Sequence, residues 1–421
     1  MDITIIETKT VPTVQIQHKG KQITFHSKYD PINEANRWAQ TELELVDSNY
    51  GITIIGLGAG YHLMEIAQLH PNLTVHAIEF NEQYFKWFMN SPFLHRVNEF
   101  KNVKISTIDS LSKDQQQKIF SQEYTNNVLI HKSALDILPP RFMSLKTILK
   151  DIQMKQKSIR RQIGNMNDNF DKNSLLNDKG IGDLRGIWHG HPAILVSAGP
   201  SLHKQLPLLK CIQKESRVHI CAVGTAVKPL LQSGITPKII VIIDPNIGTF
   251  DQLTTVDLPD TPLLYLSTAY HDTIQLHTGP RRILFQDGFD KAIGLAEQRK
   301  EPLIKSGGSV ATALLDLLVY FGANPIALVG QDLAYTNNLS HTDGAHAQKE
   351  ISGSLTVLDF YQKEQVTTER NLNSYRRWIE NYVKQVKDTG FFNCTEGGAY
   401  INNWKHISLD KFYKMLPSKN I

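Results

Sequence analysis

Residues 193–202 read Ala193-Ile194-Leu195-Val196-Ser197-Ala198-Gly199-Pro200-Ser201-Leu202, four apolar residues that lead into a loop of small residues. The same pattern returns where 218–222 precedes Gly224 and where 238–243 precedes Asp244. Unbroken β-branched runs, such as the one at 239–243, are typical of parallel strands buried on both faces. This half of the chain therefore predicts an α/β sheet, and we expect further strands at 263–266, 283–285 and 326–329.

The first part of the chain predicts a second, Rossmann-like sheet. A strand at 52–55 enters Gly56-Leu57-Gly58-Ala59-Gly60, a helix is expected at 61–69, and the next strand, 75–78, ends at Glu79. This unit resembles the cofactor loop of S-adenosylmethionine-dependent methyltransferases, in which an acid after the second strand binds ribose hydroxyls. Two interpretations stay open: a working cofactor site or a retained scaffold.

Two helical regions complete the predicted organisation. Lysines and arginines alternate with isoleucines from residue 144, which favours an amphipathic connector helix that the Asn-rich stretch 165–178 would end. Aromatic residues at helical spacing after residue 359 predict a helical C-terminal cap. The predicted parts are a Rossmann-like domain at 1–143, a helical linker at 144–186, a second α/β sheet domain at 187–350 and a helical C-terminal region at 351–421.

Composition limits the class of partner. The 421 residues carry 45 Lys and Arg against 41 Asp and Glu, and a net charge of +4 is too small to indicate nucleic-acid binding. The acidic N-terminus does not resemble a signal peptide, and the most apolar stretch, 311–330, is interrupted by polar residues. We expect a cytoplasmic protein without a membrane span. We expect no metal site, because Cys211, Cys221 and Cys394 lack short C-x-x-C spacing and no ligand cluster is visible among the histidines and acids.

The candidate site residues follow predicted strands, and in parallel sheets ligands collect at the carboxyl ends of strands. Small residues before two predicted helices offer free backbone N–H groups to a phosphate, although the first loop can also be read as a plain strand-to-helix turn. If their strands are neighbours, these two clusters can hold one phosphate from both sides. Polar residues after two other strands can bracket a ribose and a base. The predicted nucleotide-binding residues are Ser197, Gly199, Pro200, Ser201, Gly224, Thr225, Asp244, Asn246, Gly307, Gly308 and Ser309.

Five motifs in order resemble the motility-associated-factor (Maf) flagellin glycosyltransferases: 197–202, 224–226, 240–246, 307–310 and 330–335. The segments 56–79, 169–173 and 395–399 resemble parts of the same family. The core is also similar to bacterial sialyltransferases that use cytidine-monophosphate (CMP) sugars and to archaeal, MptE-like 6-hydroxymethylpterin diphosphokinases.

The resemblance implies transfer of a nonulosonic acid, of the pseudaminic or legionaminic type, from its CMP donor to Ser or Thr hydroxyls of flagellin, in support of flagellum assembly and motility. It implies a CMP-sugar donor substrate without a tightly bound cofactor. By matching motif, Gly199, Pro200 and Ser201 would lie beside the donor phosphate, and Asp332 would shape the pocket. A branched side chain at Gly199 is expected to obstruct the donor without disturbing the fold.

The transfer needs a base for the acceptor hydroxyl, and histidine suits this role near neutral pH. His341 is the first choice, with His346 and His271 in reserve, and Tyr335 is a candidate donor to the leaving phosphate. Two rival functions remain: an ATP- and magnesium-dependent diphosphokinase in which Asp244 and Asp332 bind the metal, and a flagellin-binding protein without turnover.

Overall fold

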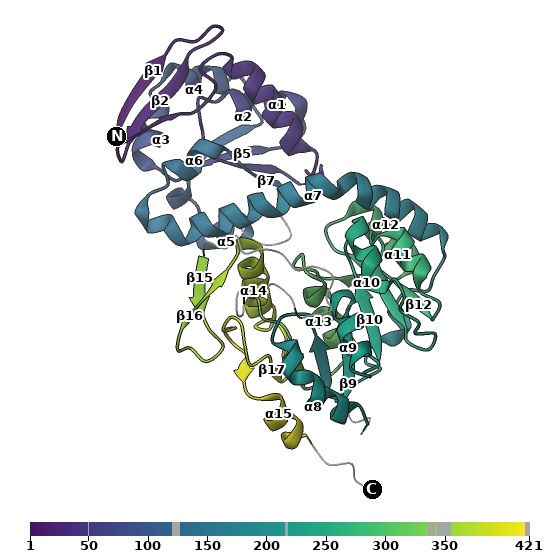
Figure 1. Cartoon of the computed structure of the whole chain (residues 1–421). Helices are drawn as coiled ribbons and strands as arrows, with labels where there is room; N and C mark the ends of the chain where they lie inside the picture. The colour runs from purple at the N-terminus through teal and green to yellow at the C-terminus, as the bar shows by residue number, and fades with distance from the viewer. Residues whose placement is uncertain (49, 120–126, 215–217, 336–341, 343–354, 417–421) are drawn as a thin grey trace. The chain divides into compact units, whose positions relative to one another are not determined.

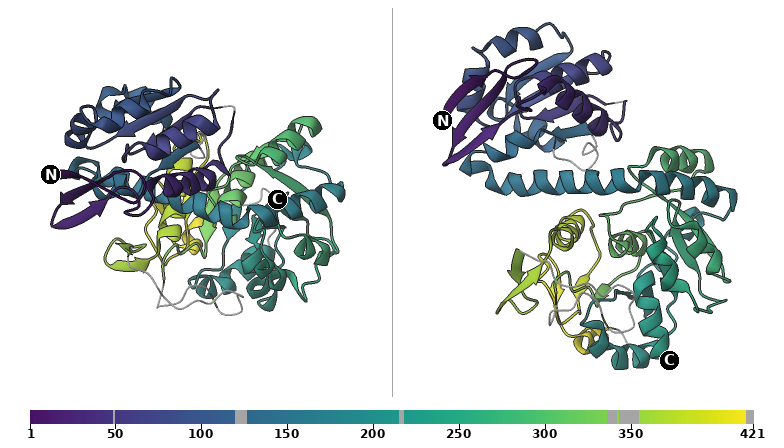
Figure 2. Two further views of the ribbon diagram at one scale, coloured as in Figure 1. Left: turned by 90° about the horizontal axis from the view of Figure 1, so that it is seen from above. Right: turned by 45° about the horizontal axis from the view of Figure 1, so that its top comes forward.

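A computed structural model describes residues 1–48, 50–119, 127–214, 218–335, 342 and 355–416. The chain divides into two compact units, Met1–Arg161 and Gln162–Ile421. The division falls inside helix α7 (Met143–Leu175), which Figures 1 and 2 show as one continuous helix. Each unit is described by itself below.

The first unit contains two sheets among its described residues. An antiparallel sheet is formed by β1 (Asp2–Ile6), β2 (Thr13–His18) and β3 (Lys21–Thr24). A parallel sheet has the order β6-β5-β4-β7, with bounds Val103–Thr107, Val75–Glu79, Ile52–Ile55 and Val128–Ile130. The helices are α1 (Pro31–Leu43), α2 (Tyr61–Leu69), α3 (Glu82–Phe88), α4 (Pro92–Val97), α5 (Lys113–Ile119) and α6 (Lys132–Asp136).

The alternation of side chains along these strands builds a core on each face of the parallel sheet. Ile52 and Ile54 join one apolar cluster together with residues of α2 to α4, whereas Ile55 joins another together with residues of α6 and the start of α7. The predicted strand, glycine loop, helix and strand at 52–79 are confirmed with the same bounds.

The second unit is built on a nine-stranded parallel sheet among its described residues, in the order β13-β12-β11-β10-β9-β8-β14-β17-β18. The bounds in this order are Leu303–Ile304, Arg281–Gln286, Leu263–Leu266, Ile239–Ile242, His219–Val223, Ala193–Val196, Ile326–Val329, Phe391–Asn393 and Lys405–His406. The helices are α8 (Leu202–Lys214), α9 (Val227–Gln232), α10 (Phe250–Leu253), α11 (His271–Leu276), α12 (Asp290–Arg299), α13 (Val310–Tyr320), α14 (Arg370–Tyr382) and α15 (Leu409–Met415).

The predicted α/β fold class is confirmed, with completely buried central strands such as β8, β10 and β14. The C-terminal region carries α14 and α15 and also adds strands: β17 and β18 extend the large sheet, and β15 (Leu355–Leu358) pairs with β16 (Gln365–Thr368). Among the described residues, no helix combines the length and the apolar character needed to cross a membrane.

The predicted end of the connector helix within 165–178 is confirmed, because α7 ends at Leu175. Asn169 donates its side-chain amide to the carbonyl oxygens of Pro245 and Thr268, at 2.9 and 3.3 Å. Asn173 donates to Ser267 and Ala269, at 3.0 and 2.8 Å. These buried contacts compensate for the low helix propensity of the two asparagines, which bind the loops at strand ends through their side-chain amides.

Candidate functional site

Strand order determines where the second unit can bind a ligand. The chain proceeds from β8 outward through β9 to β13, and helix α13 then returns it to β14 on the other side of β8. The order therefore reverses between β8 and β14. In open parallel sheets the crevice beyond the carboxyl ends at such a reversal is the usual ligand site.

Three loops meet at this reversal, and we call them the switch-point loops: 197–202 after β8, 330–335 after β14 and 395–399 after β17. The Gly199 N–H donates to the Gly330 carbonyl at 2.8 Å, and the Ala399 N–H donates to the Asp332 carbonyl at 2.7 Å. The Gln331 N–H donates to the Thr395 hydroxyl at 3.3 Å. The structure therefore brings together motifs that lie about 200 residues apart in the sequence.

Asp332 is the centre of these loops and is 3% exposed. Its carboxylate accepts the Ser201 hydroxyl at 2.5 Å and the Ser201 N–H at 3.2 Å. An added Cβ at Gly199 would lie 2.1 Å from the Asp332 Oδ1 atom and 2.5 Å from the Gly330 carbonyl oxygen. Gly199 is therefore required by packing, so the expectation that a branched side chain there leaves the fold undisturbed is wrong.

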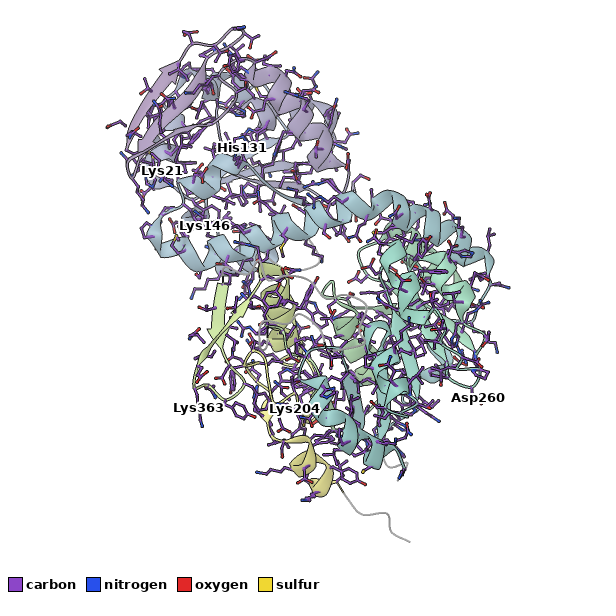
Figure 3. The ribbon with its side chains drawn as sticks, viewed as in Figure 1. Lys21, His131, Lys146, Lys204, Asp260 and Lys363 are labelled. Carbon is purple, nitrogen blue, oxygen red and sulfur yellow. The ribbon has the colours of Figure 1, made fainter. Side chains whose placement is uncertain are left out.

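The first predicted amide cluster is largely occupied from within the protein. The Gly199 N–H binds Gly330, the Ser201 N–H binds Asp332, and the Leu202 N–H donates to the Gly199 carbonyl at 2.9 Å. The Ser197 hydroxyl, in contrast, is buried without a hydrogen-bond partner at the end of β8. Positive charge at this end of α8 comes from Lys204, an exposed side chain that donates to the Glu396 carbonyl (Figure 3). Lys204 was not among the residues predicted from the sequence, although its place in the first turn after the small-residue loop could have indicated a phosphate contact.

The second predicted amide cluster, Gly307 to Ser309, follows β13. Four strands separate β13 from β8, so the condition that the two strands are neighbours is not met. Gly307 packs on α14, since an added Cβ would lie 2.5 Å from the Trp378 ring. The N–H groups of Gly307 and Ser309 donate to the Thr312 hydroxyl at 2.9 and 3.3 Å, and that of Gly308 donates to the Ser306 hydroxyl at 3.2 Å.

The residues predicted near the cytidine follow β9 and β10. Gly224 is buried, with Gln252 filling the space that a side chain would take, and Thr225 is half-buried. Asp244 is exposed, and its carboxylate accepts the backbone and side-chain N–H groups of Asn246, both at 2.9 Å. These polar groups lie at the same edge of the sheet as the switch-point loops, because all the strands are parallel.

His271 is the described histidine with the geometry of a base. It begins α11 after β11, and its Nδ1 atom lies 2.9 Å from the Asn173 Oδ1 atom. Because an amide oxygen only accepts, Nδ1 carries the proton and Nε2 keeps a lone pair. Burial lowers the pKa of His271 below its usual value, which favours this neutral form. His341 and His346 lie outside the described residues.

Tyr335 is buried, and its backbone N–H donates to the Thr367 carbonyl at 2.8 Å. Burial, together with a hydrogen bond to the Glu369 carboxylate, raises the pKa of Tyr335 to about 12. The Tyr335 hydroxyl is therefore a weak acid already bound to Glu369. A cavity of about 500 Å³ lies beside the third switch-point loop, and its lining includes Glu396, Tyr361, Tyr400 and Trp404.

The glycine loop of the first unit does not offer the predicted ribose contact. Glu79 is 1% exposed, and its carboxylate accepts the N–H groups of Leu57, Phe80 and Asn81 at 3.2, 2.9 and 2.9 Å. Burial raises the pKa of Glu79 to about 7. With both carboxylate oxygens bound to the backbone, these contacts favour the scaffold interpretation of the loop over an S-adenosylmethionine site.

The fold and the switch-point loops define an α/β protein with two parallel sheets, each of which reverses its strand order once among the described strands. Residues 160–338 match the family described as 6-hydroxymethylpterin diphosphokinase MptE-like. The structure is similar to that of the MAf glycosyltransferase from Magnetospirillum magneticum AMB-1, with a TM-score of 0.53 and 15% sequence identity over 99% of this chain and 71% of that chain. No curated protein matches the sequence. Residues 160–338 are therefore similar to the MptE-like family, and the chain shares its fold with the MAf glycosyltransferase, in agreement with the resemblance seen in the sequence.

Proposed function

We propose that this protein is a glycosyltransferase that moves a nonulosonic acid from a CMP donor to Ser or Thr hydroxyls of flagellin, in the cytoplasm, in support of flagellum assembly and motility. The observation that carries the proposal is the fold shared with the MAf glycosyltransferase over 99% of this chain. The reversal between β8 and β14 supports it, because the family motifs 197–202 and 330–335 and the similar segment 395–399 gather there.

The donor lies along the carboxyl edge of the large sheet in this proposal. Its phosphate lies beside Gly199, Pro200 and Ser201. The backbone amides of this loop already bind other groups of the protein. We therefore assign to Lys204 the stabilisation of the negative charge on the departing phosphate. The cytidine lies towards Gly224, Thr225, Asp244 and Asn246, with Gly308 and Ser309 as further contacts and Asp332 as the support of the loop.

His341 remains the first choice for the base, and the geometry of His271 makes it a second candidate. The Asn173 contact leaves the His271 Nε2 atom as an acceptor for a hydroxyl proton. Strand β11 lies three strand positions from β8, about 14 Å at about 4.8 Å per strand, a distance that an extended nucleotide sugar can span.

The family description of residues 160–338 supports a second candidate function, the magnesium-dependent diphosphokinase. In that function Asp244 and Asp332 would share the metal. Their strands, β10 and β14, are three positions apart, about 14 Å, whereas Mg²⁺ binds its oxygen ligands at about 2.1 Å. The Asp332 carboxylate is also bound to Ser201, so we favour the transferase.

One experiment separates the three functions. The protein is incubated with purified flagellin and CMP-pseudaminic or CMP-legionaminic acid, with and without magnesium, and the flagellin is weighed by mass spectrometry. We expect a gain of one or more sugar masses that persists in EDTA. Magnesium-dependent diphosphorylation of 6-hydroxymethylpterin in a parallel incubation with ATP would support the diphosphokinase instead, and co-purification of flagellin with the protein without any mass gain would support the non-catalytic alternative.

A further inference from the structure

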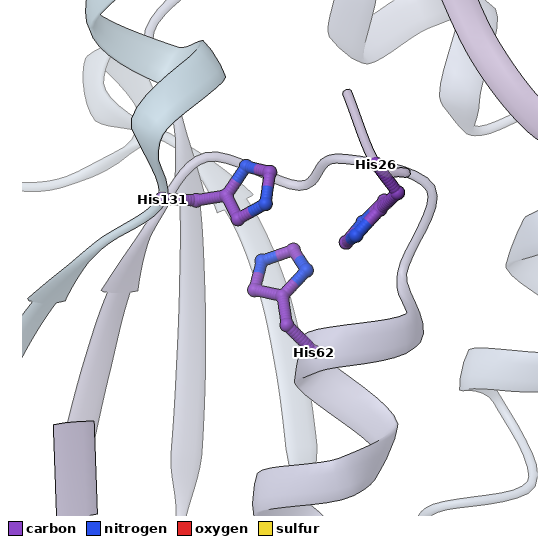
Figure 4. Close-up of side chains that lie close together, drawn as sticks. All are labelled: His26, His62 and His131. Atoms are coloured by element: carbon purple, nitrogen blue, oxygen red, sulfur yellow. The ribbon is translucent and has the colours of Figure 1, made fainter. Parts of the chain in front are cut away.

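Three histidines from separate segments of the first unit lie together. His26 follows β3, His62 is the second residue of α2, and His131 directly follows β7. All three are buried, and one ring nitrogen of each lies within 4.8 Å of those of the other two. Figure 4 shows the rings facing one another.

The cluster lies at the strand reversal of its own sheet. The chain runs from β4 through β5 to β6, and β7 then pairs on the other side of β4, so the reversal lies between β4 and β7. Gly58, in the loop after β4, has φ +49°, and an added Cβ would lie 2.8 Å from the His26 Nε2 atom. The glycine loop therefore makes room for imidazoles at the position where α/β sheets bind their ligands.

Two of the histidines, His62 and His131, also have an outer contact of the kind that orients a metal ligand. The His62 Nε2 atom lies 3.0 Å from the Gly56 carbonyl oxygen, and the His131 Nδ1 atom lies 2.6 Å from the Ser133 hydroxyl. The His26 Nδ1 atom lies 3.7 Å from the Glu34 carboxylate. Metal-bound histidines usually donate their second N–H to such groups.

Two of the three inner nitrogens lack a hydrogen-bond partner. The His62 Nδ1 atom and the His26 Nε2 atom are buried without a hydrogen-bond partner. Buried polar atoms without a partner cost free energy, and a bound cation would supply that partner.

We propose that His26 Nε2, His62 Nδ1 and His131 Nε2 bind one zinc ion, with the fourth coordination position open. Three imidazoles with one open position are typical of zinc. Nitrogen ligands at about 2.05 Å from a tetrahedral zinc ion lie about 3.4 Å from one another. The two ring nitrogens that are farthest apart must therefore approach each other by up to about 1.5 Å. Rotation of the imidazole rings can supply this movement.

The open position would face a cavity of about 690 Å³ that the three histidines help to line. Lys19, Lys21, Lys132 and Lys146 also line this cavity, and Figure 3 labels two of them, Lys21 and Lys146, with His131. We therefore expect the fourth ligand to be water or a small anion such as a carboxylate or phosphate. The zinc site does not depend on the proposed transfer reaction.

The first test uses the full chain stripped of metal with a chelator. Calorimetric titration with zinc chloride is expected to show one site per chain with a micromolar or lower Kd, and cobalt is expected to give the intense visible absorption of a tetrahedral site. Absence of stoichiometric zinc binding by the wild-type protein overturns the proposal, whatever the variants do.

The second test grades the contributions of the side chains. His131→Ala removes a ligand and is expected to weaken zinc binding by more than about 100-fold, whereas Ser133→Ala, which only orients His131, is expected to weaken it by about 10- to 100-fold. His95→Asn, at an exposed histidine of the same unit, is the matched control and is expected to bind as the wild type does. Circular dichroism checks that each variant is folded, and unchanged affinity in a folded His131→Ala variant also overturns the proposal.

Discussion

Strands β4 and β7 in the first unit, and β8 and β14 in the second, mark the same topological event, the reversal of strand order in a parallel sheet. The loops at the two reversals differ in chemistry. In the first unit the glycine loop faces three buried histidines and a cavity lined by lysines. In the second, the small-residue loop is bound by the carboxylate of Asp332.

The comparison teaches that a glycine-rich turn after a strand does not by itself specify a ligand. Gly58 and Gly199 both leave room for a neighbouring side chain to approach the backbone closely. The neighbours of Gly58 are imidazoles, whereas the neighbour of Gly199 is the carboxylate of Asp332. The topology fixes where a ligand can bind, and the side chains from distant strand ends decide which ligand the site can accept.

The largest expected effect concerns the base at the carboxyl edge of the second unit. Loss of the base is expected to slow transfer by about 100- to 10,000-fold, roughly 3 to 5 kcal/mol of activation free energy, with donor affinity kept. We predict this loss for His341→Ala or for His271→Ala, and side-by-side steady-state kinetics identify which. If His271 is the base, activity falls as the pH drops through its pKa, which lies below 6.5.

His203→Ala, at an exposed histidine of α8, is the control for both variants and is expected to keep wild-type turnover. Full turnover in both His341→Ala and His271→Ala would show that the base is another residue. The assignment of catalysis to these two histidines of the second unit would then be wrong.

The next prediction concerns packing at Gly199. Gly199→Val would drive a branched side chain into Asp332 and the Gly330 carbonyl, and we expect it to destabilise the second unit by about 3 kcal/mol or more. Denaturant titration followed by tryptophan fluorescence measures the change. Gly294→Val is the control, because no atom lies within 4 Å of an added Cβ there. Equal stability of the two variants would contradict the packing described for the switch-point loops.

A pH-dependent prediction concerns Glu79 beside the glycine loop of the first unit. Its pKa is about 7 in the folded protein and about 4.5 when unfolded, so between these values the folded state holds a proton that the unfolded state releases. This contribution to stability is complete below pH 4.5 and is lost as the pH rises to 7, by about 3 kcal/mol. Glu79→Gln removes the titration.

The free energy of unfolding of the wild type relative to Glu79→Gln should therefore be about 3 kcal/mol lower at pH 7.5 than at pH 4.5, as measured by denaturant titration. Glu99→Gln, at an exposed carboxylate, serves as the control, with the same difference from the wild type at both pH values. If the difference in free energy of unfolding between the wild type and Glu79→Gln is also the same at both pH values, burial does not raise the pKa of Glu79.

The smallest expected effect concerns Asn173 on α7. Asn173→Ala removes hydrogen bonds to Ser267, Ala269 and His271, and we expect a loss of about 1 to 3 kcal/mol in stability. Thermal unfolding measures it, with Asn165→Ala, at an exposed hydrogen bond, as the weaker comparison. If His271 is the base, Asn173→Ala should also reduce turnover, because Nδ1 loses the acceptor that fixes its proton.

Much of the fold was predictable because it depends on local patterns. The strands at 52–55, 193–196 and 326–329 were predicted with the bounds that the structure has, since continuous apolar runs between small-residue loops leave few alternatives. The end of α7 within 165–178 was predicted as well, but the carbonyl oxygens that Asn169 and Asn173 bind lie about 75 to 100 residues away, and no local pattern reveals these contacts.

By itself, the sequence determined two parallel sheets, their glycine-rich strand ends and the family to which their motifs point, because burial and turn chemistry are read from neighbouring residues. Only the tertiary structure decided that four strands separate β13 from β8, that Asp332 binds Ser201, and that His26, His62 and His131 converge. Strand order is a property of the whole sheet, and residues separated by tens of positions meet only when that order is set.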